Sequence, residues 1–200
     1  MKKLMFGAAL ALLGASGAHA QDDVLKTPAD FAAITNEQER SAAIFTEMGK
    51  VLEHPRCVNC HPVTGAATQG NDLHPHNPPI IRGDGDFGAV GMNCNACHGP
   101  ENIPFQTGAG TMPGAADGWM MAPVSLGWRD KSLGEICAIL KDPNATGGHD
   151  LQEVHDELAG NSLIGWAWDA GGRTQPPGSQ AEFAALTQAW IDTGAACPAS

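Results

Sequence analysis

The chain has 200 residues, 22 of them acidic and 11 basic, which gives a formal net charge of −11 at pH 7. This length fits a single domain. The acidity argues against nucleic acid and anionic membrane surfaces as partners, because their phosphates would repel the chain. It favours solubility, and electrostatic docking onto a basic patch of a partner protein.

The first 20 residues have the organisation of a secretory signal peptide. Lys2 and Lys3 precede an apolar run over residues 4–13, and residues 18–20 read Ala-His-Ala, an A-x-A cleavage site. We expect cleavage after Ala20, with a retained N-terminal anchor as the alternative. Loss of both lysines leaves 9 basic against 22 acidic residues, a net charge of −13. No later stretch is long and apolar enough to span a bilayer.

A helix is predicted over residues 36–53. Asn36 and Glu39 have the spacing of a helix-starting cap, and Pro55 disfavours helical backbone at the residue before it. The segment between them presents one apolar face, made of Ile44, Phe45, Met48, Val51 and Leu52. This helix leads the chain directly into the first of two related pentapeptides.

Both pentapeptides read C-x-x-C-H, the attachment signal for c-type haem. Two thiols at this spacing reach the two vinyl groups of a porphyrin, and the histidine that follows ligates the iron. Haem is attached in this way after export, so the pair of motifs and the leader together predict a bacterial periplasm. The proximal iron ligands are then His61 and His98, and the motifs are Cys57-Val58-Asn59-Cys60-His61 and Cys94-Asn95-Ala96-Cys97-His98.

Two other roles are open to the same four cysteines. Cys57, Cys60, Cys94 and Cys97 have the paired spacing of a four-thiolate zinc site, and they could instead form two disulfides. Neither role requires a histidine directly after both second cysteines. Haem attachment explains these histidines and is therefore the favoured interpretation.

Between residues 62 and 131 neither helix nor strand periodicity is visible. Glycine, proline, asparagine and aspartate dominate, as in Arg82-Gly83-Asp84-Gly85-Asp86, and these residues interrupt regular structure. We expect ordered loops that wrap the porphyrin faces, which Trp119 and Trp128 would help to cover. A flexible linker over residues 62–92 is the alternative.

Helices return after residue 131. Three start signals pair a capping residue with a glutamate three positions later, and a short apolar cluster covers residues 163–168. The start signals are Ser132 with Glu135, Asp150 with Glu153, and Ser179 with Glu182. No segment shows a clean period of two, so the fold class is mainly α with extensive ordered coil. The remaining cysteines, Cys137 and Cys197, are expected to form a disulfide in an oxidising compartment.

The sixth ligand of each iron decides whether it carries electrons or binds peroxide or gas. His155 is the first candidate, because Leu151, His155 and Leu158 fall on one helix face. An unpaired imidazole on a buried stripe would be costly there, and ligation would satisfy it. A hydrogen bond to a carbonyl is the alternative.

Four further residues are distal candidates. His74 and His76 lie two apart in an extended segment and should point to one side; the alternative is a solvated pair. His54 is a third candidate, but only two residues separate it from Cys57, which restricts where its ring can reach. His149 resembles a surface residue and is not a candidate. Met121 is a weaker candidate, with haem packing as the alternative.

The chain resembles dihaem c-type cytochromes, and more narrowly the small exported proteins labelled isoquinoline 1-oxidoreductase subunits. The resemblance covers nearly all of the mature chain. It rests on both motifs and on residues 53–62, Asp72-Leu73-His74-Pro75-His76 with Arg82-Gly83, Trp119 with Met121-Ala122-Pro123, Ile136-Cys137, residues 140–143, Trp166-Ala167-Trp168, Ala189-Trp190, Gly194-Ala195 and Cys197-Pro198.

This resemblance implies a cytochrome c-like fold in which two covalently attached haems form much of the core. It also implies an electron-accepting partner for a periplasmic molybdenum hydroxylase or another dehydrogenase. The chain has no molybdopterin or iron–sulfur signature, so no catalysis of its own is expected.

We therefore expect one dihaem domain over residues 21–200, with a first haem region at 36–93 and a second at 94–200. Its expected function is periplasmic electron transfer. A small peroxidase-like enzyme or a haem sensor with one open iron position is the alternative, as is a metal-binding module built on His74 and His76.

Overall fold

The structure is a computed structural model that describes residues 24–106 and 110–199. The predicted signal peptide and its cleavage point after Ala20 lie outside these ranges. Within them the chain is mainly helical with few short strands, which confirms the coarse fold class. No helix in the described ranges has the length and apolar character needed to cross a membrane.

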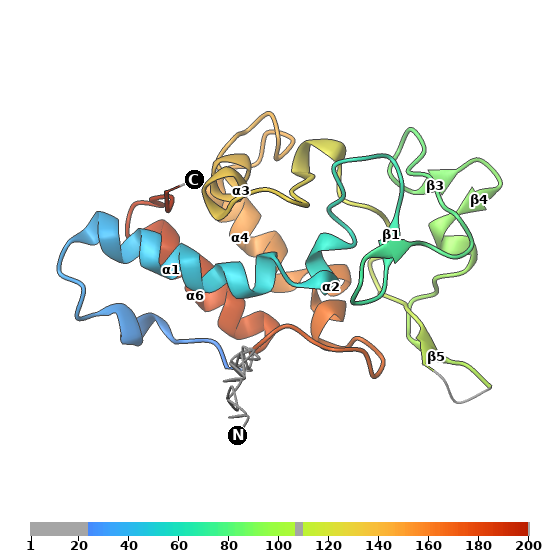
Figure 1. The fold of residues 1–200 in the computed structure, drawn as a ribbon, viewed down its shortest axis with the longest axis horizontal. Helices are drawn as coiled ribbons and strands as arrows, with labels where there is room; N and C mark the ends of the chain where they lie inside the picture. The colour runs from blue at the N-terminus through green and yellow to red at the C-terminus, as the bar shows by residue number, and fades with distance from the viewer. Residues whose placement is uncertain (1–23, 107–109, 200) are drawn as a thin grey trace, which may run out of the picture.

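Two lobes make up the molecule (Figure 1). The helical lobe comprises residues 24–61 and 128–199, and the loop lobe comprises the described part of 62–127. The helical segments are η1 (Pro28–Phe31), α1 (Glu37–Leu52), α2 (Pro55–Val58), η2 (Cys94–Ala96), η3 (Val124–Leu126), α3 (Leu133–Leu140), α4 (Leu151–Gly160), α5 (Ser162–Gly165), η4 (Trp166–Trp168) and α6 (Gln180–Asp192).

Local caps explain where the main helices begin. Asn36 Oδ1 accepts a hydrogen bond from the Glu39 backbone N–H at 3.0 Å, so α1 starts where the sequence predicts. Helices α3 and α4 begin with complete capping boxes, at Ser132 and Asp150 respectively. Helix α6 begins after Ser179. These starts confirm the predicted helices.

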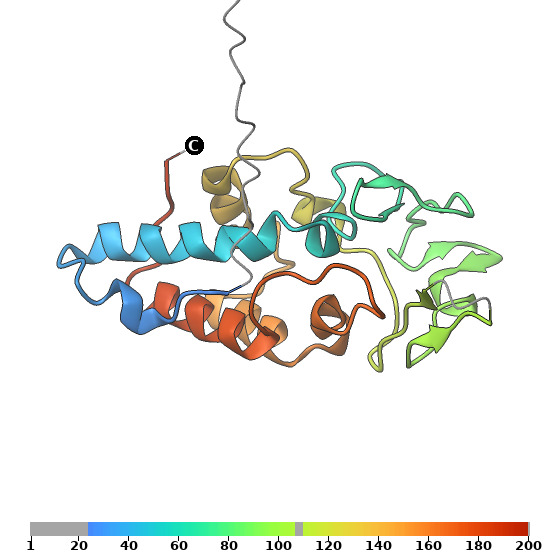
Figure 2. The same ribbon diagram turned by 60° about the horizontal axis from the view of Figure 1, so that its bottom comes forward.

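The core of the helical lobe lies between α1, α6, α3 and α4. Helix α1 packs along α6, and α4 packs on α6 from another side (Figures 1 and 2). The Phe45 and Trp190 rings meet there with centroids 5.0 Å apart, and both are fully buried with Met48 and Val51. Each such side chain stabilises the fold by about 1.5–3 kcal/mol. The predicted apolar face of α1 is thus the one that is buried.

Cys137 and Cys197 form a disulfide, as predicted, with their Cα atoms 5.6 Å apart. The bond ties the C-terminal segment to α3, and Lys141 Nζ adds a hydrogen bond to the Ala195 carbonyl at 2.7 Å. Chain segments 60 residues apart in sequence are therefore fixed to each other. This closes the helical lobe at the end remote from the loop lobe (Figure 1).

The loop lobe contains three antiparallel hairpins of two-residue strands, which are too short to show a period of two in the sequence. They pair β1 (Thr68–Gln69) with β2 (His74–Pro75), β3 (Gly88–Ala89) with β4 (Met92–Asn93), and β5 (Ile103–Pro104) with β6 (Thr111–Met112). Backbone hydrogen bonds tie these loops together, including Arg82 N–H to Gly65 O at 2.7 Å and Cys94 N–H to Phe87 O at 2.8 Å.

Candidate functional site

The first pentapeptide is positioned by the short helix α2. His54 is its N-cap, because His54 Nδ1 accepts a hydrogen bond from the Arg56 backbone N–H at 3.2 Å. Pro55 occupies the first helical position, where its missing N–H costs nothing. Cys57 therefore lies in helical backbone, and the His61 N–H reaches back to the Cys57 carbonyl at 3.2 Å.

The His61 ring has two close neighbours. Its Nδ1 lies 2.7 Å from the Leu126 carbonyl oxygen, and its face stacks on Trp128 with ring centroids 3.4 Å apart and planes 14° from parallel. A carbonyl can only accept, so Nδ1 carries the proton and Nε2 keeps its lone pair. Burial lowers the pKa of His61 to about 4, so the ring is neutral at pH 7.

The second pentapeptide repeats these surroundings with different partners. The Asn93 side chain caps η2 by accepting from the Asn95 N–H at 2.9 Å. His98 Nδ1 lies 2.8 Å from the Pro113 carbonyl oxygen, and the ring stacks on Trp119 with centroids 4.6 Å apart and planes 10° from parallel. Burial lowers the pKa of His98 as well. Both motif histidines are therefore held as neutral rings with Nε2 available to a metal.

No family model, curated protein or solved structure matches this chain. What the site does must therefore be argued from its own residues. The strongest argument is that His61 and His98 have the same kind of surroundings, with Nδ1 of each ring close to a backbone carbonyl.

The four motif cysteines are free thiols in the structure. Burial raises the pKa of Cys57 to about 12 and that of Cys60 to about 11. Cys94 contributes a smaller part of the increase in the pKa of Cys60. Among the described residues no group of three or more His, Cys, Asp or Glu side chains is gathered to hold a metal ion. The structure thus assembles neither the zinc site nor the two extra disulfides that the cysteine spacing allows.

Two buried arginines lie near the first motif. Arg56 and Arg82 are only 4% and 7% exposed, and the Nε atom of each lacks a hydrogen-bond partner within the described ranges. Arg56 Nη2 donates to the Gly70 carbonyl at 2.9 Å and to Asn71 Oδ1 at 2.7 Å, which are neutral acceptors. Arg82 has one carboxylate partner, Asp86 at 2.8 Å.

A third arginine adds to this positive charge. Burial lowers the pKa of Arg56 most, and the charge of Arg173 lowers it further, so the two guanidinium groups are near each other. Arg173 donates to Thr111 and to a backbone carbonyl, and neither Arg56 nor Arg173 has a carboxylate partner in the described residues. One buried and one half-buried cation with spare N–H groups fit an anionic cofactor such as the propionates of haem.

His54 and His74 have their ring nitrogens committed elsewhere. His54 is 3% exposed, and its Nδ1 is the acceptor in the cap of α2, so a neutral ring carries its proton on Nε2. His74 lies at 2.6 Å from Asp72 Oδ1 through Nδ1 and at 3.1 Å from Gln69 Nε2 through Nε2. Neither ring offers a free lone pair to iron in this arrangement.

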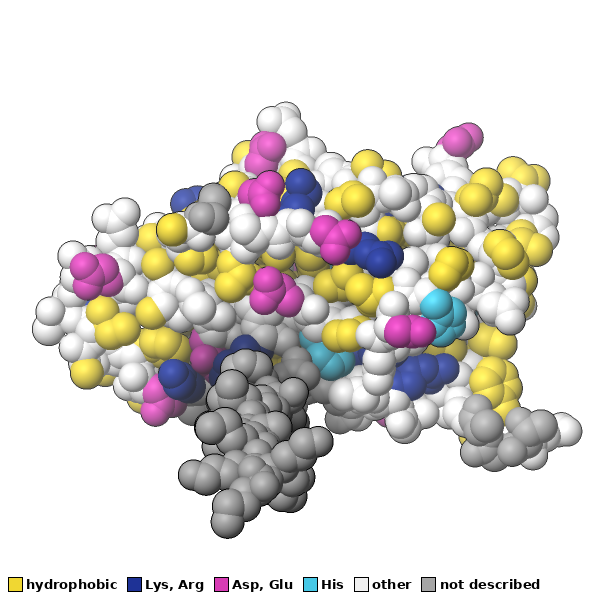
Figure 3. Space-filling view, viewed as in Figure 1, with side chains coloured by type: hydrophobic (Ala, Val, Ile, Leu, Met, Phe, Trp, Pro, Cys, Tyr) yellow, Lys and Arg dark blue, Asp and Glu magenta, His cyan; other side chains and the backbone are white. Residues whose placement is uncertain are grey.

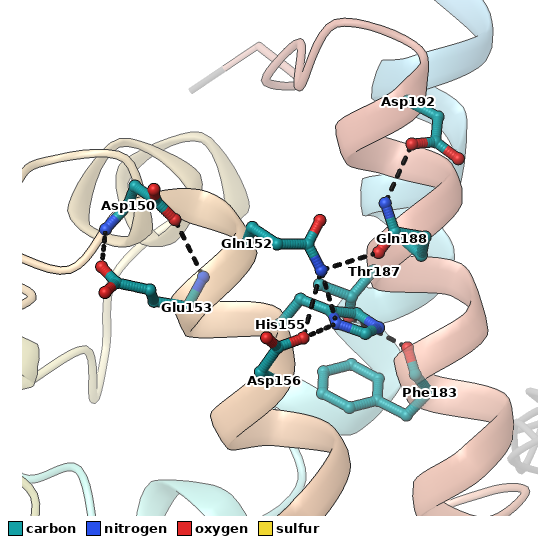
Figure 4. Close-up of polar contacts among 9 residues, drawn as sticks. All are labelled: Asp150, Gln152, Glu153, His155, Asp156, Phe183, Thr187, Gln188 and Asp192. Carbon is teal, nitrogen blue, oxygen red and sulfur yellow. Dashed lines mark hydrogen bonds and ion pairs between the residues drawn. The ribbon is translucent and has the colours of Figure 1, made fainter.

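His155 lies in a polar network between α4 and α6 (Figure 4). Its Nδ1 is 2.9 Å from Asp156 Oδ1 and 3.1 Å from Gln152 Nε2, and Gln152 also donates to Gln188 on α6 at 3.1 Å. The side chain is 17% exposed rather than fully buried. Within the described residues no contact links His155 to either pentapeptide, so its predicted ligation stays a prediction.

Met121 and His76 lie closer to the motifs. Met121 is buried, and the next residue, Ala122, donates its N–H to the Cys60 carbonyl at 3.1 Å. His76 lies beside His98, with ring centroids 6.1 Å apart. The structure thus brings Met121 to the first motif and His76 to the second.

Sequence reasoning missed two functional features of this site. Arg56 was not singled out, and nothing in its pattern marks it as buried beyond its position next to Cys57. The capping role of His54 had a usable signal, because an acceptor side chain directly before proline is a common helix start.

Proposed function

We propose that the protein is a periplasmic dihaem c-type cytochrome that carries electrons to or from a partner oxidoreductase. The observation that carries this proposal is the shared environment of His61 and His98. Each ring follows a C-x-x-C pair, donates Nδ1–H to a backbone carbonyl and stacks on a tryptophan. Metal-ligating histidines almost always donate their other ring N–H in this way, because the second hydrogen bond fixes the tautomer and the ring orientation.

The chain supplies a complete set of attachment groups for two haems. Cys57 and Cys60 would bind the first porphyrin and Cys94 and Cys97 the second, through thioether bonds. Haem, when bound, supplies iron that gains and loses one electron. Trp128 and Trp119 stack on the two proximal rings and restrict their orientations.

The arrangement of charges supports a carrier with two linked centres. Ala122 N–H donates to the Cys60 carbonyl, Met121 N–H to the Asp86 carbonyl and Cys94 N–H to the Phe87 carbonyl, so a short hydrogen-bonded path links the two attachment sites. Arg56 and Arg173 place positive charge beside them, where propionates of either haem find partners. Neighbouring centres suit transfer of electrons through the chain.

The partner that fits is a periplasmic redox protein with a basic docking patch. The mature chain has 9 basic and 22 acidic residues and so a net charge of −13, which raises the rate of encounter with a basic surface. The resemblance to isoquinoline 1-oxidoreductase subunits suggests a molybdenum hydroxylase or another dehydrogenase as that partner.

The test uses the full chain produced with its leader in a bacterium that matures c-type cytochromes. Mass spectrometry should find the mature chain plus two haem groups. The reduced spectrum should not change when carbon monoxide is added, because both irons are six-coordinate. Carbon monoxide binding at one haem in the unaltered protein would favour the peroxidase-like or sensor alternative. A folded, colourless protein with no added mass would overturn the proposal.

A further inference from the structure

We propose that His76 is the second axial ligand of the iron bound by His98, so that the second motif forms a bis-histidine centre. The inference rests on the proposed attachment of haem at Cys94 and Cys97. It assigns one residue among the several distal candidates, and it assigns it to the second haem, not the first.

The separation of the two rings fits ligation of one metal between them. The centroids of His76 and His98 are 6.1 Å apart, with planes at 65°. Two imidazoles that bind one metal ion from opposite sides, with nitrogens about 2 Å from the metal, hold their ring centres about 6 Å apart. Edge-to-face aromatic pairs also occur at this distance, so the hydrogen bonds of His76 must decide between the two.

The hydrogen bonds of His76 match those of the two motif histidines. His76 Nδ1 lies 2.7 Å from the Pro78 carbonyl oxygen, as His61 Nδ1 lies 2.7 Å from Leu126 O and His98 Nδ1 lies 2.8 Å from Pro113 O. The carbonyl fixes the proton on Nδ1 and leaves the Nε2 lone pair free. His74, two residues earlier, has both nitrogens engaged.

The backbone around His76 is anchored at both ends. The His76 N–H donates to the Ala67 carbonyl at 3.1 Å, and the preceding residues pair as β1 and β2. At the other end of this hairpin the Gly70 carbonyl accepts from Arg56 Nη2 at 2.9 Å and from Asn59 Nδ2 at 2.8 Å. Asn59 lies inside the first pentapeptide. The hairpin is thus held by the first motif and presents His76 to the second.

Two single variants, made in the full periplasm-matured chain, test the assignment. In His76→Ala we expect one of the two ferric haems to become high-spin, and one reduced haem per chain to bind carbon monoxide. The matched control is His74→Ala, which removes an exposed imidazole of the same hairpin and should leave both haems low-spin. Imidazole added to His76→Ala should restore the low-spin spectrum, because it fills the space that the side chain leaves.

A third variant keeps the test decisive if the alanine change weakens the loop. His76→Met retains a side chain that can ligate, and it should move the near-infrared band of one haem from the bis-histidine to the histidine–methionine position and raise one of the two reduction potentials. The inference is overturned if His76→Ala keeps two attached haems that are both low-spin and closed to carbon monoxide. If the unaltered chain carries no haem by mass, the proposed function falls first and the inference falls with it.

Discussion

The two lobes obtain their interiors in different ways. In the helical lobe the buried hydrophobic cluster is continuous and includes Phe45, Ile136 and Trp190. In the described part of the loop lobe the buried apolar side chains are few, with Cys94, Ala115 and Met121 among them. Over residues 24–106 and 110–199, eight of the nine large hydrophobic side chains that stay exposed belong to the loop lobe: Val63, Ile81, Phe87, Val90, Met92, Ile103, Phe105 and Val124.

This difference suggests what the loop lobe lacks. Apolar side chains are visible on its surface in the space-filling view, toward the right-hand end of the molecule (Figure 3). A chain segment that cannot bury enough apolar surface does not offset the entropy of ordering its backbone. The helical lobe has a continuous side-chain core, whereas the proposed porphyrins, attached at the boundary of the lobes by the first motif and within the loop lobe by the second, would cover the apolar side chains that the loop lobe leaves exposed. The experiments below change one stabilising feature at a time: the second haem attachment site, the disulfide of the helical lobe, or the cap of α2.

The largest expected effect follows removal of the second attachment site. In the double variant Cys94→Ala, Cys97→Ala, one haem should be missing by mass. Amide exchange should then rise at least about tenfold in the hairpins β3–β4 and β5–β6, because the free energy of local opening falls when the haem contacts that opposed it are absent. Amides of α1 and α6 should keep their protection.

The control for this experiment is the single variant Met92→Ala, which changes an exposed side chain on β4 and should leave exchange unaltered. Equal loss of protection in both lobes of the cysteine variant would show that the lobes fold as one cooperative unit. That outcome would contradict the contrast drawn between them.

The disulfide provides the complementary test in the helical lobe. Replacing Cys137 and Cys197 together with alanine opens a loop that spans 60 residues, and should lower the free energy of unfolding by about 3–4 kcal/mol. Denaturant titration followed by far-ultraviolet circular dichroism measures this change. The haem absorption spectrum at 25 °C should stay as in the unaltered protein, because the disulfide joins α3 to the C-terminal segment and not to a motif. A spectral change before unfolding would argue against independent lobes.

The smallest expected effect is a dependence of stability on pH at the joint between α1 and α2. Burial, with a smaller contribution from Arg56, lowers the pKa of His54 from 6.5 to about 4. Between these values the unfolded chain binds a proton that the folded chain excludes, so stability should fall as the pH drops through this window. Above pH 6.5 the contribution of His54 is constant.

The matched variant is His54→Asn, which keeps an N-cap acceptor but does not titrate. Its unfolding free energy should vary less between pH 4 and pH 6.5 than that of the unaltered protein, measured by denaturant titration at several pH values. An unchanged slope would mean that His54 is solvated or protonated in the folded state, and that α2 is not capped by its ring.

Features that depend on neighbouring residues could be predicted from the sequence. The starts at Asn36, Ser132 and Asp150 follow from side chains that satisfy the first free N–H groups of their own helices. The pairing of Cys137 with Cys197 followed from counting, because the other four cysteines belong to the motifs. Such signals need no knowledge of tertiary contacts.

Features that depend on distant residues could not be predicted. A helical periodicity places His155 on the inner face of α4, but it cannot reveal that Gln152 reaches Gln188 on α6 and forms a polar seam there. The approach of His76 to His98 is set by loops without any periodicity. The burial of Arg56 likewise depends on the carbonyl of Gly70 in a turn fourteen residues away.

Trp128 and Trp119 connect the two motif histidines to different helical segments. Its indole N–H donates to the Leu52 carbonyl at 3.0 Å, at the end of α1, while its ring lies against His61. Trp119, the counterpart beside His98, contacts Trp166, and its backbone N–H donates to Asn95 Oδ1 at 2.7 Å. Both motif histidines are therefore braced against the helical lobe, the first through the end of α1 and the second through η4.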